Sequence, residues 1–299
     1  MSSQEPVPFY ADDTLEDLQR GGFRMLQKKN GFRFGLDSVL LAAYTASFYN
    51  KQLKRKLTAA DLGAGCGAVS LLLAARLPML SLVGLELDET SHEALTRNIR
   101  LNRLENRLQA VQGDVCLLAD GRLTDDRLPA GSFDLVVCNP PYQRQDQVDR
   151  HPTGVVPNES SRQARVETAL PLDMLLRAAA RLLRTGGRLV MVHQVRRLPD
   201  ILCTLRTCGL EAKTMRLIQT LPDKAPVTFL LAAVRQGRPG GFQTDPPLVV
   251  CSSPGVWSNE TAALYGLEPH LTPDDLMRGL IRVSESDGDY YSEGDGSDD

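Results

Sequence analysis

The stretch LTAADLGAGCG, residues 57–67, decides how the rest of the chain is interpreted. A mostly apolar run, typical of a buried strand, leads into a loop with glycines at positions 63, 65 and 67, and a helical pattern follows. Glycine permits a sharp turn and a close approach of the backbone to a ligand at a helix N-terminus. The motif alone leaves an NAD enzyme open, because Gly63, Gly65 and Ala68 also satisfy the looser dinucleotide pattern.

The alternation of strand and helix continues beyond this stretch. Strands alternating with helices predict a doubly wound, Rossmann-like α/β fold with a mostly parallel sheet covered on both faces. The apolar runs 210–219 and 226–235, joined by LPDKA, favour an antiparallel hairpin at the sheet edge. Residues 236–256, rich in Gly and Pro, are expected to form an irregular connection to a short C-terminal helix. The expected strands are 57–62, 80–86, 107–112, 133–138 and 187–193, and the expected helices are 67–76, 89–101, 172–184 and 196–208.

The net charge of −3 conceals a mildly basic body. Residues 284–299 contain seven acidic residues and no Lys or Arg, which leaves 34 basic and 30 acidic residues elsewhere. An acidic segment of this kind buries too little apolar surface to offset its ordering entropy, so we expect a disordered tail. The basic run 51–56 is either a solvated helix face or a contact for RNA phosphates.

Several protein classes are disfavoured by composition. The six cysteines form no CxxC pair and the four histidines are scattered, so neither a metal site nor a disulfide framework is expected. The most apolar stretch, 68–87, is broken by Arg76 and Pro78, and the N-terminus has no secretory pattern. We therefore expect a cytoplasmic protein with no membrane contact.

Acidic residues lie at or just after the ends of two of the expected strands. Glu86 ends the second strand, where a carboxylate can accept hydrogen bonds from both ribose hydroxyls of a nucleoside cofactor. Asp88 is better placed than Glu86 to begin the following helix. Asp114 follows Gly113 after the third strand, where a short polar side chain can meet an adenine amino group. A plain turn explains Gly113-Asp114 equally well.

The most specific motif is Asn139-Pro140-Pro141-Tyr142, directly after the buried run 133–138. Two consecutive prolines restrict the backbone and keep the Pro140 carbonyl out of a helix. Ligands of open α/β sheets bind at the carboxyl ends of strands, which is where the motif lies. The Asn139 and Pro140 carbonyl oxygens can accept both hydrogens of a planar NH2 group, and Tyr142 offers a face for stacking. The alternative is a rigid turn.

These elements, in this order, resemble the amino-methyltransferases that act on adenine N6, cytosine N4 or glutamine N5. The segment GFRFGLDSVLLA, residues 31–42, resembles the N-terminal signature of bacterial tRNA1(Val) (adenine-37-N6)-methyltransferases. Residues 157–159, followed by Arg165 and Glu167, resemble that family's loop, although Val166 departs from it. The similarity extends to about residue 250, and the acidic tail lies outside the family pattern.

The resemblance implies S-adenosyl-L-methionine as cofactor, tRNA as substrate and adenine N6 as the methylated atom. Together with the composition, the sequence predicts four parts of the chain: a lead-in over 1–56 that packs on the core, a methyltransferase domain over 57–250, a C-terminal extension over 251–283 and the acidic tail over 284–299. The implied cofactor-binding residues are Asp37, Asp61, Gly63, Gly65, Gly67, Glu86 and Asp114, and the implied catalytic residues are Asn139, Pro140, Pro141 and Tyr142.

Two alternatives stay open. A glutamine N5-methyltransferase acting on a protein such as a release factor would handle the same planar NH2, but those enzymes have a longer helical N-terminal domain before the glycine motif. A non-catalytic RNA-binding protein could keep the fold without its chemistry. The intact glycine loop and tetrapeptide favour an enzyme over that second alternative.

Overall fold

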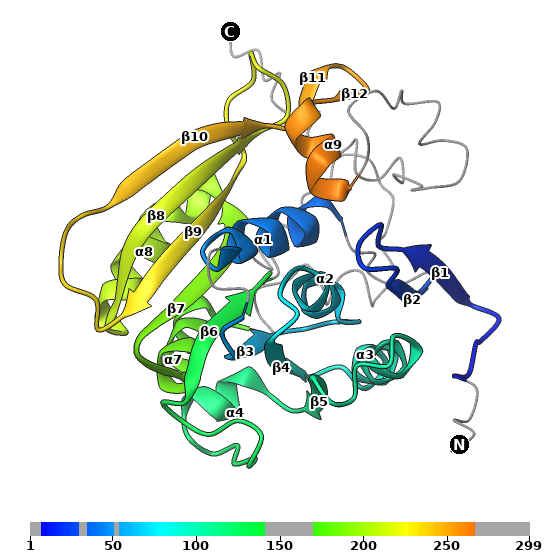
Figure 1. Ribbon diagram of the computed structural model, residues 1–299. Helices are drawn as coiled ribbons and strands as arrows, with labels where there is room; N and C mark the ends of the chain where they lie inside the picture. The colour runs from blue at the N-terminus through cyan, green and yellow to red at the C-terminus, as the bar shows by residue number, and fades with distance from the viewer. Residues whose placement is uncertain (1–6, 30–34, 51–53, 141–169, 267–299) are drawn as a thin grey trace, which may run out of the picture.

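The computed structural model describes residues 7–29, 35–50, 54–140 and 170–266 (Figure 1). An eight-stranded sheet with the order β10-β8-β9-β7-β6-β3-β4-β5 lies at its centre. The strands from β5 to β7 run parallel to one another, and β9 runs antiparallel to both β7 and β8. The predicted doubly wound, mostly parallel sheet with an antiparallel hairpin is therefore confirmed. Its strands are β3 (Leu57–Leu62), β4 (Leu80–Glu86), β5 (Leu108–Gln112), β6 (Phe133–Cys138), β7 (Leu183–Gln194), β8 (Leu210–Gln219), β9 (Thr228–Arg235) and β10 (Gln243–Val249).

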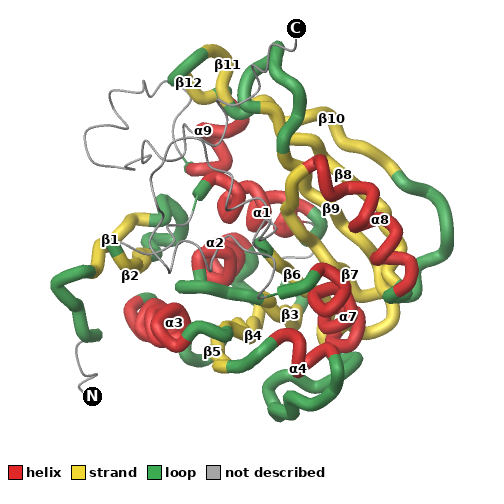
Figure 2. Tube along the Cα trace, turned by 180° about the vertical axis from the view of Figure 1, so that it is seen from behind, coloured by secondary structure: helices red, strands yellow, loops and turns green. Residues whose placement is uncertain are grey.

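Helices cover both faces of the sheet, as Figure 1 and Figure 2 show from opposite sides. One face packs against α1 (Leu36–Ser47), α2 (Ala68–Arg76) and α3 (Glu89–Leu101). The other face packs against α4 (Val115–Ala119), α7 (Leu172–Leu182) and α8 (Leu198–Thr207), which follows the 3-10 turn η3 (Val195–Arg197). Successive strand residues point to opposite faces, so each central strand contributes side chains to both cores. None of the helices in these ranges is long and apolar enough to cross a membrane.

The lead-in begins with an antiparallel hairpin of β1 (Asp13–Asp17) and β2 (Arg24–Lys28), which the sequence analysis did not predict. Two neighbouring residues of α3 fasten it. The Arg97 guanidinium pairs with buried Asp13, and the Asn98 amide exchanges hydrogen bonds with the backbone of Leu26 at 2.6 and 2.8 Å. Burial alone would raise the pKa of Asp13, but hydrogen bonds led by that from Arg97 lower it to about 2. The hairpin thus packs on the core, while the proposed domain boundaries stay a prediction.

The prediction of an irregular connection over 236–256 is wrong. Strand β10 pairs in parallel with β8 and becomes the outer strand, beyond the predicted hairpin. Its Pro246-Pro247 pair coincides with a shift in register, which an edge strand tolerates because its outer side needs no ladder hydrogen bonds. A small hairpin of β11 (Cys251–Ser253) and β12 (Val256–Trp257) follows. The predicted short C-terminal helix is confirmed as α9 (Asn259–Tyr265).

Candidate active site

The candidate site lies at the carboxyl edge of the parallel strands. Strands β4 and β5 extend the sheet on one side of β3, and β6 extends it on the other, so the strand order reverses between β3 and β6. Such a switch point is where open α/β sheets bind ligands. Because Asp61 is in register with Gly84 of β4 and Val137 of β6, the residues that end these strands share one edge. The structure therefore brings Asp61, Glu86 and Asn139 to the same end of the sheet.

The glycines after β3 divide into two kinds. Gly63 and Gly65 adopt positive φ angles of 72° and 56°, and a Cβ on either would meet no described atom within 4 Å. Gly67 also has positive φ, but a Cβ there would lie 2.5 Å from Cδ1 of Leu95 on α3. Gly67 thus allows the loop to pack closely against Leu95 of α3. The open space at Gly63 and Gly65 is where a ligand can approach the backbone.

Glu86 is held in place by two backbone groups. Its carboxylate accepts hydrogen bonds from the N–H of Gly65 at 2.7 Å and the N–H of Asp88 at 2.9 Å. Asp88 itself caps α3 by accepting from the N–H of Ser91, as the sequence predicted, so Glu86 is not the helix-capping acid. A carboxylate has about four acceptor positions, and two of them stay available for hydroxyl groups of a ligand.

Leu87 is an exposed apolar residue at the candidate site that the sequence analysis did not single out. It directly follows Glu86, and 52% of its surface is exposed. A large exposed apolar side chain beside a fixed carboxylate offers a flat surface to the ring of a bound nucleoside. An apolar residue between two acids, at a strand's carboxyl end, was the signal that could have identified it.

Asp61 is buried at the end of β3, where its Oδ2 accepts a 2.7 Å hydrogen bond from the hydroxyl of Ser70 on α2. Burial raises the pKa of Asp61 to about 7, the Ser70 hydrogen bond opposes this rise, and the nearby charge of Glu86 adds to it. Ser70 was not predicted, because its partner lies in a different element. The protein therefore places a carboxyl group of near-neutral pKa directly beneath the glycine loop.

Asp114 has a structural role. Its Oδ1 accepts a 2.7 Å hydrogen bond from the N–H of Cys116, and the side chain caps the N-terminus of α4. This agrees with the plain-turn interpretation of Gly113-Asp114. A contact with the cofactor's adenine stays a prediction.

Asn139 follows β6 directly, and its amide meets the first turn of α1. Its Nδ2 donates a 3.3 Å hydrogen bond to the hydroxyl of Ser38, which directs Oδ1 to the other side of the amide. Ser38 is buried and is another residue that the sequence analysis did not single out. Asp37, its neighbour in the same turn, is partly buried, and its role toward the cofactor stays a prediction. Pro140 is described, whereas Pro141, Tyr142 and the family-like loop 157–167 lie outside the described residues.

The described end of the basic run, residues 54–56, does not line this site. Residues 54–56 precede Leu57 at the amino end of β3, and Arg55 pairs with Asp134 near the start of β6 at 3.0 Å. A six-residue strand spans about 20 Å, so residues 54–56 lie about that far from the glycine loop. Residues 51–53 of the run are outside the described part of the chain. Within the described ranges, no group of three or more His, Cys, Asp or Glu residues is arranged to hold a metal ion.

Comparison with known proteins agrees with this geometry. Residues 44–158 match the family model described as methyltransferase small domain. The chain is 30% identical over 198 residues to the tRNA1(Val) (adenine(37)-N6)-methyltransferase of Porphyromonas gingivalis, covering 66% of this chain and 72% of that one. It is 27% identical over 258 residues to the enzyme of that name from Yersinia pestis, covering 83% and 93%.

Solved structures share the fold. A predicted O-methyltransferase from Agrobacterium tumefaciens superposes with a TM-score of 0.57 at 20% identity, covering 78% of this chain and 97% of that one. TYW2 of Pyrococcus horikoshii, solved in complex with MeSAdo, gives a TM-score of 0.50 at 16% identity, covering 76% and 73%. The glycine loop, the sheet and these relatives agree that the protein is an S-adenosyl-L-methionine-dependent methyltransferase, and the chain belongs to the tRNA1(Val) (adenine(37)-N6)-methyltransferase family.

Proposed function

We propose that this enzyme methylates N6 of adenine 37 in a tRNA of the tRNA1(Val) type, in the cytoplasm. The observation that supports it best is the position of Asn139, which continues β6 at the switch point with its amide oriented by Ser38. An Asn carbonyl oxygen at that point, next to the Pro140 carbonyl, suits a planar NH2 group. The family relatives carry this substrate in their names.

The described residues fit the cofactor. Gly63 and Gly65 leave open space beside the backbone, the Glu86 carboxylate is held with acceptor positions to spare, and Leu87 exposes an apolar surface beside it. In this proposal Glu86 binds the ribose hydroxyls, Leu87 covers the adenine ring and Asp61 lies beneath the loop that holds the amino acid part. When bound, S-adenosyl-L-methionine supplies a methyl group carried on a positively charged sulfur.

The protein's contribution to the chemistry is mainly positioning. The nitrogen lone pair of adenine N6 is delocalised into the ring, which makes it a poor nucleophile. Hydrogen bonds from the NH2 to Asn139 Oδ1 and the Pro140 carbonyl would favour a pyramidal nitrogen with its lone pair directed at the methyl group. Alignment of this kind can contribute about 7–11 kcal/mol. The nitrogen becomes acidic only once it is methylated, so no strong base is needed beforehand and the proton can leave to solvent.

Glu86→Ala is expected to weaken S-adenosyl-L-methionine binding by about 1–3 kcal/mol, the scale of hydrogen bonds to a charged group. Titration calorimetry of the two proteins measures this difference. Glu89→Ala is the matched control, because it removes the same charge from an exposed position three residues later, in the first turn of α3. Equal affinities of Glu86→Ala and wild type would place the ribose elsewhere.

The substrate is tested by supplying labelled methyl donor with total RNA, ribosomes and release factors, followed by nucleoside and amino-acid analysis. We expect the label in N6-methyladenosine of tRNA. Label in glutamine would overturn the tRNA assignment and favour the protein substrate. Absence of any transferred label, with intact cofactor binding, would favour a non-catalytic RNA-binding protein.

A further inference from the structure

Two polar side-chain oxygens near the site have no hydrogen-bond partner among the described residues. Gln194, the last residue of β7, lies directly opposite Thr228, the first residue of β9. Within that part of the chain, Gln194 Oε1 and Thr228 Oγ1 are both buried without a partner, and Thr228 is only 6% exposed. Leaving a buried polar atom unsatisfied is costly and rare, so two such atoms in one cross-strand pair require an explanation.

The pair faces the same side of the sheet as Asn139. Residues two apart on a strand share a face. Two residues before Gln194, Val192 packs in the core cluster beneath α1, and Leu230, two residues after Thr228, packs in the same cluster. Val137, two residues before Asn139, belongs to that cluster as well. Both members of the pair and Asn139 therefore point toward α1.

The register places the pair close to the target site. Cys138 of β6 is in register with Met191 of β7, so Asn139 continues opposite Val192. Gln194 lies two residues farther along the neighbouring strand, which corresponds to about 8 Å between the Cα atoms of Gln194 and Asn139. The unsatisfied oxygens thus lie just beyond the group proposed to hold the base.

The chemistry of the pair selects its ligand. The amide oxygen of Gln194 needs a donor, and the Thr228 hydroxyl can supply a donor beside it. Once both N6 hydrogens of adenine are bound at Asn139 and Pro140, the base offers only acceptor nitrogens. A ribose 2′-hydroxyl both donates and accepts, and it distinguishes RNA from DNA. We propose that Gln194 and Thr228 form a subsite for the 2′-hydroxyl of the target nucleotide, an inference that rests on the proposed tRNA substrate.

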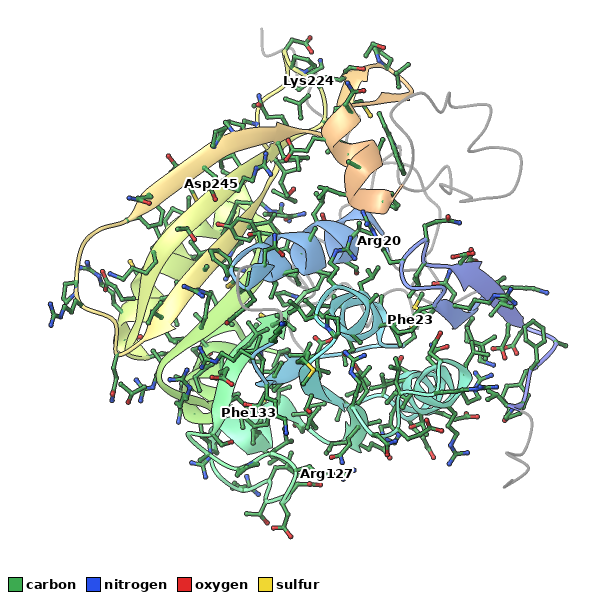
Figure 3. All side chains as sticks on the ribbon, in the orientation of Figure 1. Arg20, Phe23, Arg127, Phe133, Lys224 and Asp245 are labelled. Atoms are coloured by element: carbon green, nitrogen blue, oxygen red, sulfur yellow. The ribbon has the colours of Figure 1, made fainter. Side chains whose placement is uncertain are left out.

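The surroundings suit an RNA backbone. Arg196 is exposed two residues after Gln194, and exposed Lys224 lies in the loop between β8 and β9 that leads to Thr228. Figure 3 shows Lys224 at the opposite end of the molecule from Phe133, which begins β6. Positive side chains on the segments that flank the pair can hold phosphates while the pair contacts the sugar.

Thr228→Val separates a functional from a structural role, because it replaces an unsatisfied hydroxyl with a methyl of similar size. We expect a melting temperature no lower than that of wild type, unchanged affinity for S-adenosyl-L-methionine, and kcat/KM for tRNA reduced about 3- to 10-fold. Thr45→Val is the matched control, since Thr45 is 0% exposed and its Oγ1 has no partner in the described ranges, but it lies about 10 Å along α1 from Ser38. Wild-type kcat/KM in Thr228→Val, or an equal loss in Thr45→Val, would overturn the proposal.

A second measurement identifies the ligand. Wild type and Gln194→Met are assayed on full-length tRNA and on the same tRNA with 2′-deoxyadenosine at the target position. We expect the deoxy substitution to lower kcat/KM about 3- to 10-fold for wild type and to have no further effect on Gln194→Met. If the deoxy substitution lowers kcat/KM of Gln194→Met by the same factor as that of wild type, the 2′-hydroxyl assignment is overturned, although the tRNA activity stands. A wild-type enzyme inactive on both RNAs would instead overturn the proposed function itself.

Discussion

Replacement of Asn139 by alanine is expected to lower kcat for tRNA methylation by about 10²- to 10³-fold while affinity for S-adenosyl-L-methionine changes by less than about twofold. The amide is proposed to align the target nitrogen, so its loss affects the transition state and leaves the proposed cofactor site on β3 and β4 intact. Single-turnover methylation measured alongside calorimetric cofactor binding separates the two quantities.

Two further variants define what the amide does. Ser38→Ala removes the 3.3 Å hydrogen bond that orients Asn139 and should lower kcat about 2- to 10-fold, because the amide keeps its oxygen but loses its fixed direction. Asn102→Ala serves as the control for general loss of stability, since that amide bonds to the backbone of Arg24 and Asn98. An Asn139→Ala enzyme with wild-type turnover would mean that Asn139-Pro140 is only a rigid turn.

The central part of the fold was predictable because its signals are local. The boundaries of β3, β4, α3 and β6 agree with the sequence predictions. Gly63 follows β3, the acid Glu86 ends β4, the capping acid Asp88 precedes α3, and Asn139-Pro140 follows β6. The hairpin of β1 and β2 gave no such signal. It depends on Arg97 and Asn98, more than 70 residues away, and no local pattern announces that contact. Strand β10 was missed because Pro246-Pro247 argues against a strand except at a sheet edge.

The residues of the candidate site also fall into those that a local motif predicts and those that only the fold brings together. Glu86 and Asn139 stood out because a strand end and a particular residue type coincide in one short motif. Ser38 and Ser70 are ordinary helix residues until the fold brings them to Asn139 and Asp61. Their contribution is to fix the direction of another side chain, and a single sequence contains no trace of that relation.

Asp61→Asn is expected to stabilise the free protein at neutral and alkaline pH. The pKa of Asp61 is raised from 3.8 to about 7 by burial, so between about pH 4 and pH 7 the folded state holds a proton that the unfolded state releases. The free energy of unfolding is therefore unaffected by this group below about pH 4, and it falls as pH rises from about 4 to about 7, where the folded state also loses the proton. Asparagine does not ionise, and its carbonyl oxygen can still accept the Ser70 hydrogen bond.

The expected difference is large because the carboxylate is buried. A rise of about three pKa units corresponds to about 4 kcal/mol at pH 8, or on the order of 10 °C in melting temperature. Melting temperatures of wild type and Asp61→Asn, measured from pH 5 to pH 8, should diverge as pH rises. A difference that stays constant over this range would show that the Asp61 carboxyl titrates as an ordinary exposed acid.

The same substitution should weaken S-adenosyl-L-methionine binding, and such a loss would account for the presence of a destabilising acid. A buried carboxylate without a cation is unfavourable, whereas a cationic ligand nearby lowers its pKa and recovers part of the desolvation cost. Wild-type affinity for S-adenosyl-L-methionine should therefore increase as pH rises through about 7, and the affinity of Asp61→Asn should not. S-adenosylhomocysteine lacks the sulfonium charge, so its binding should depend less steeply on pH in the wild-type protein. If both ligands bind Asp61→Asn as tightly as wild type, the carboxyl group serves only to tie β3 to α2.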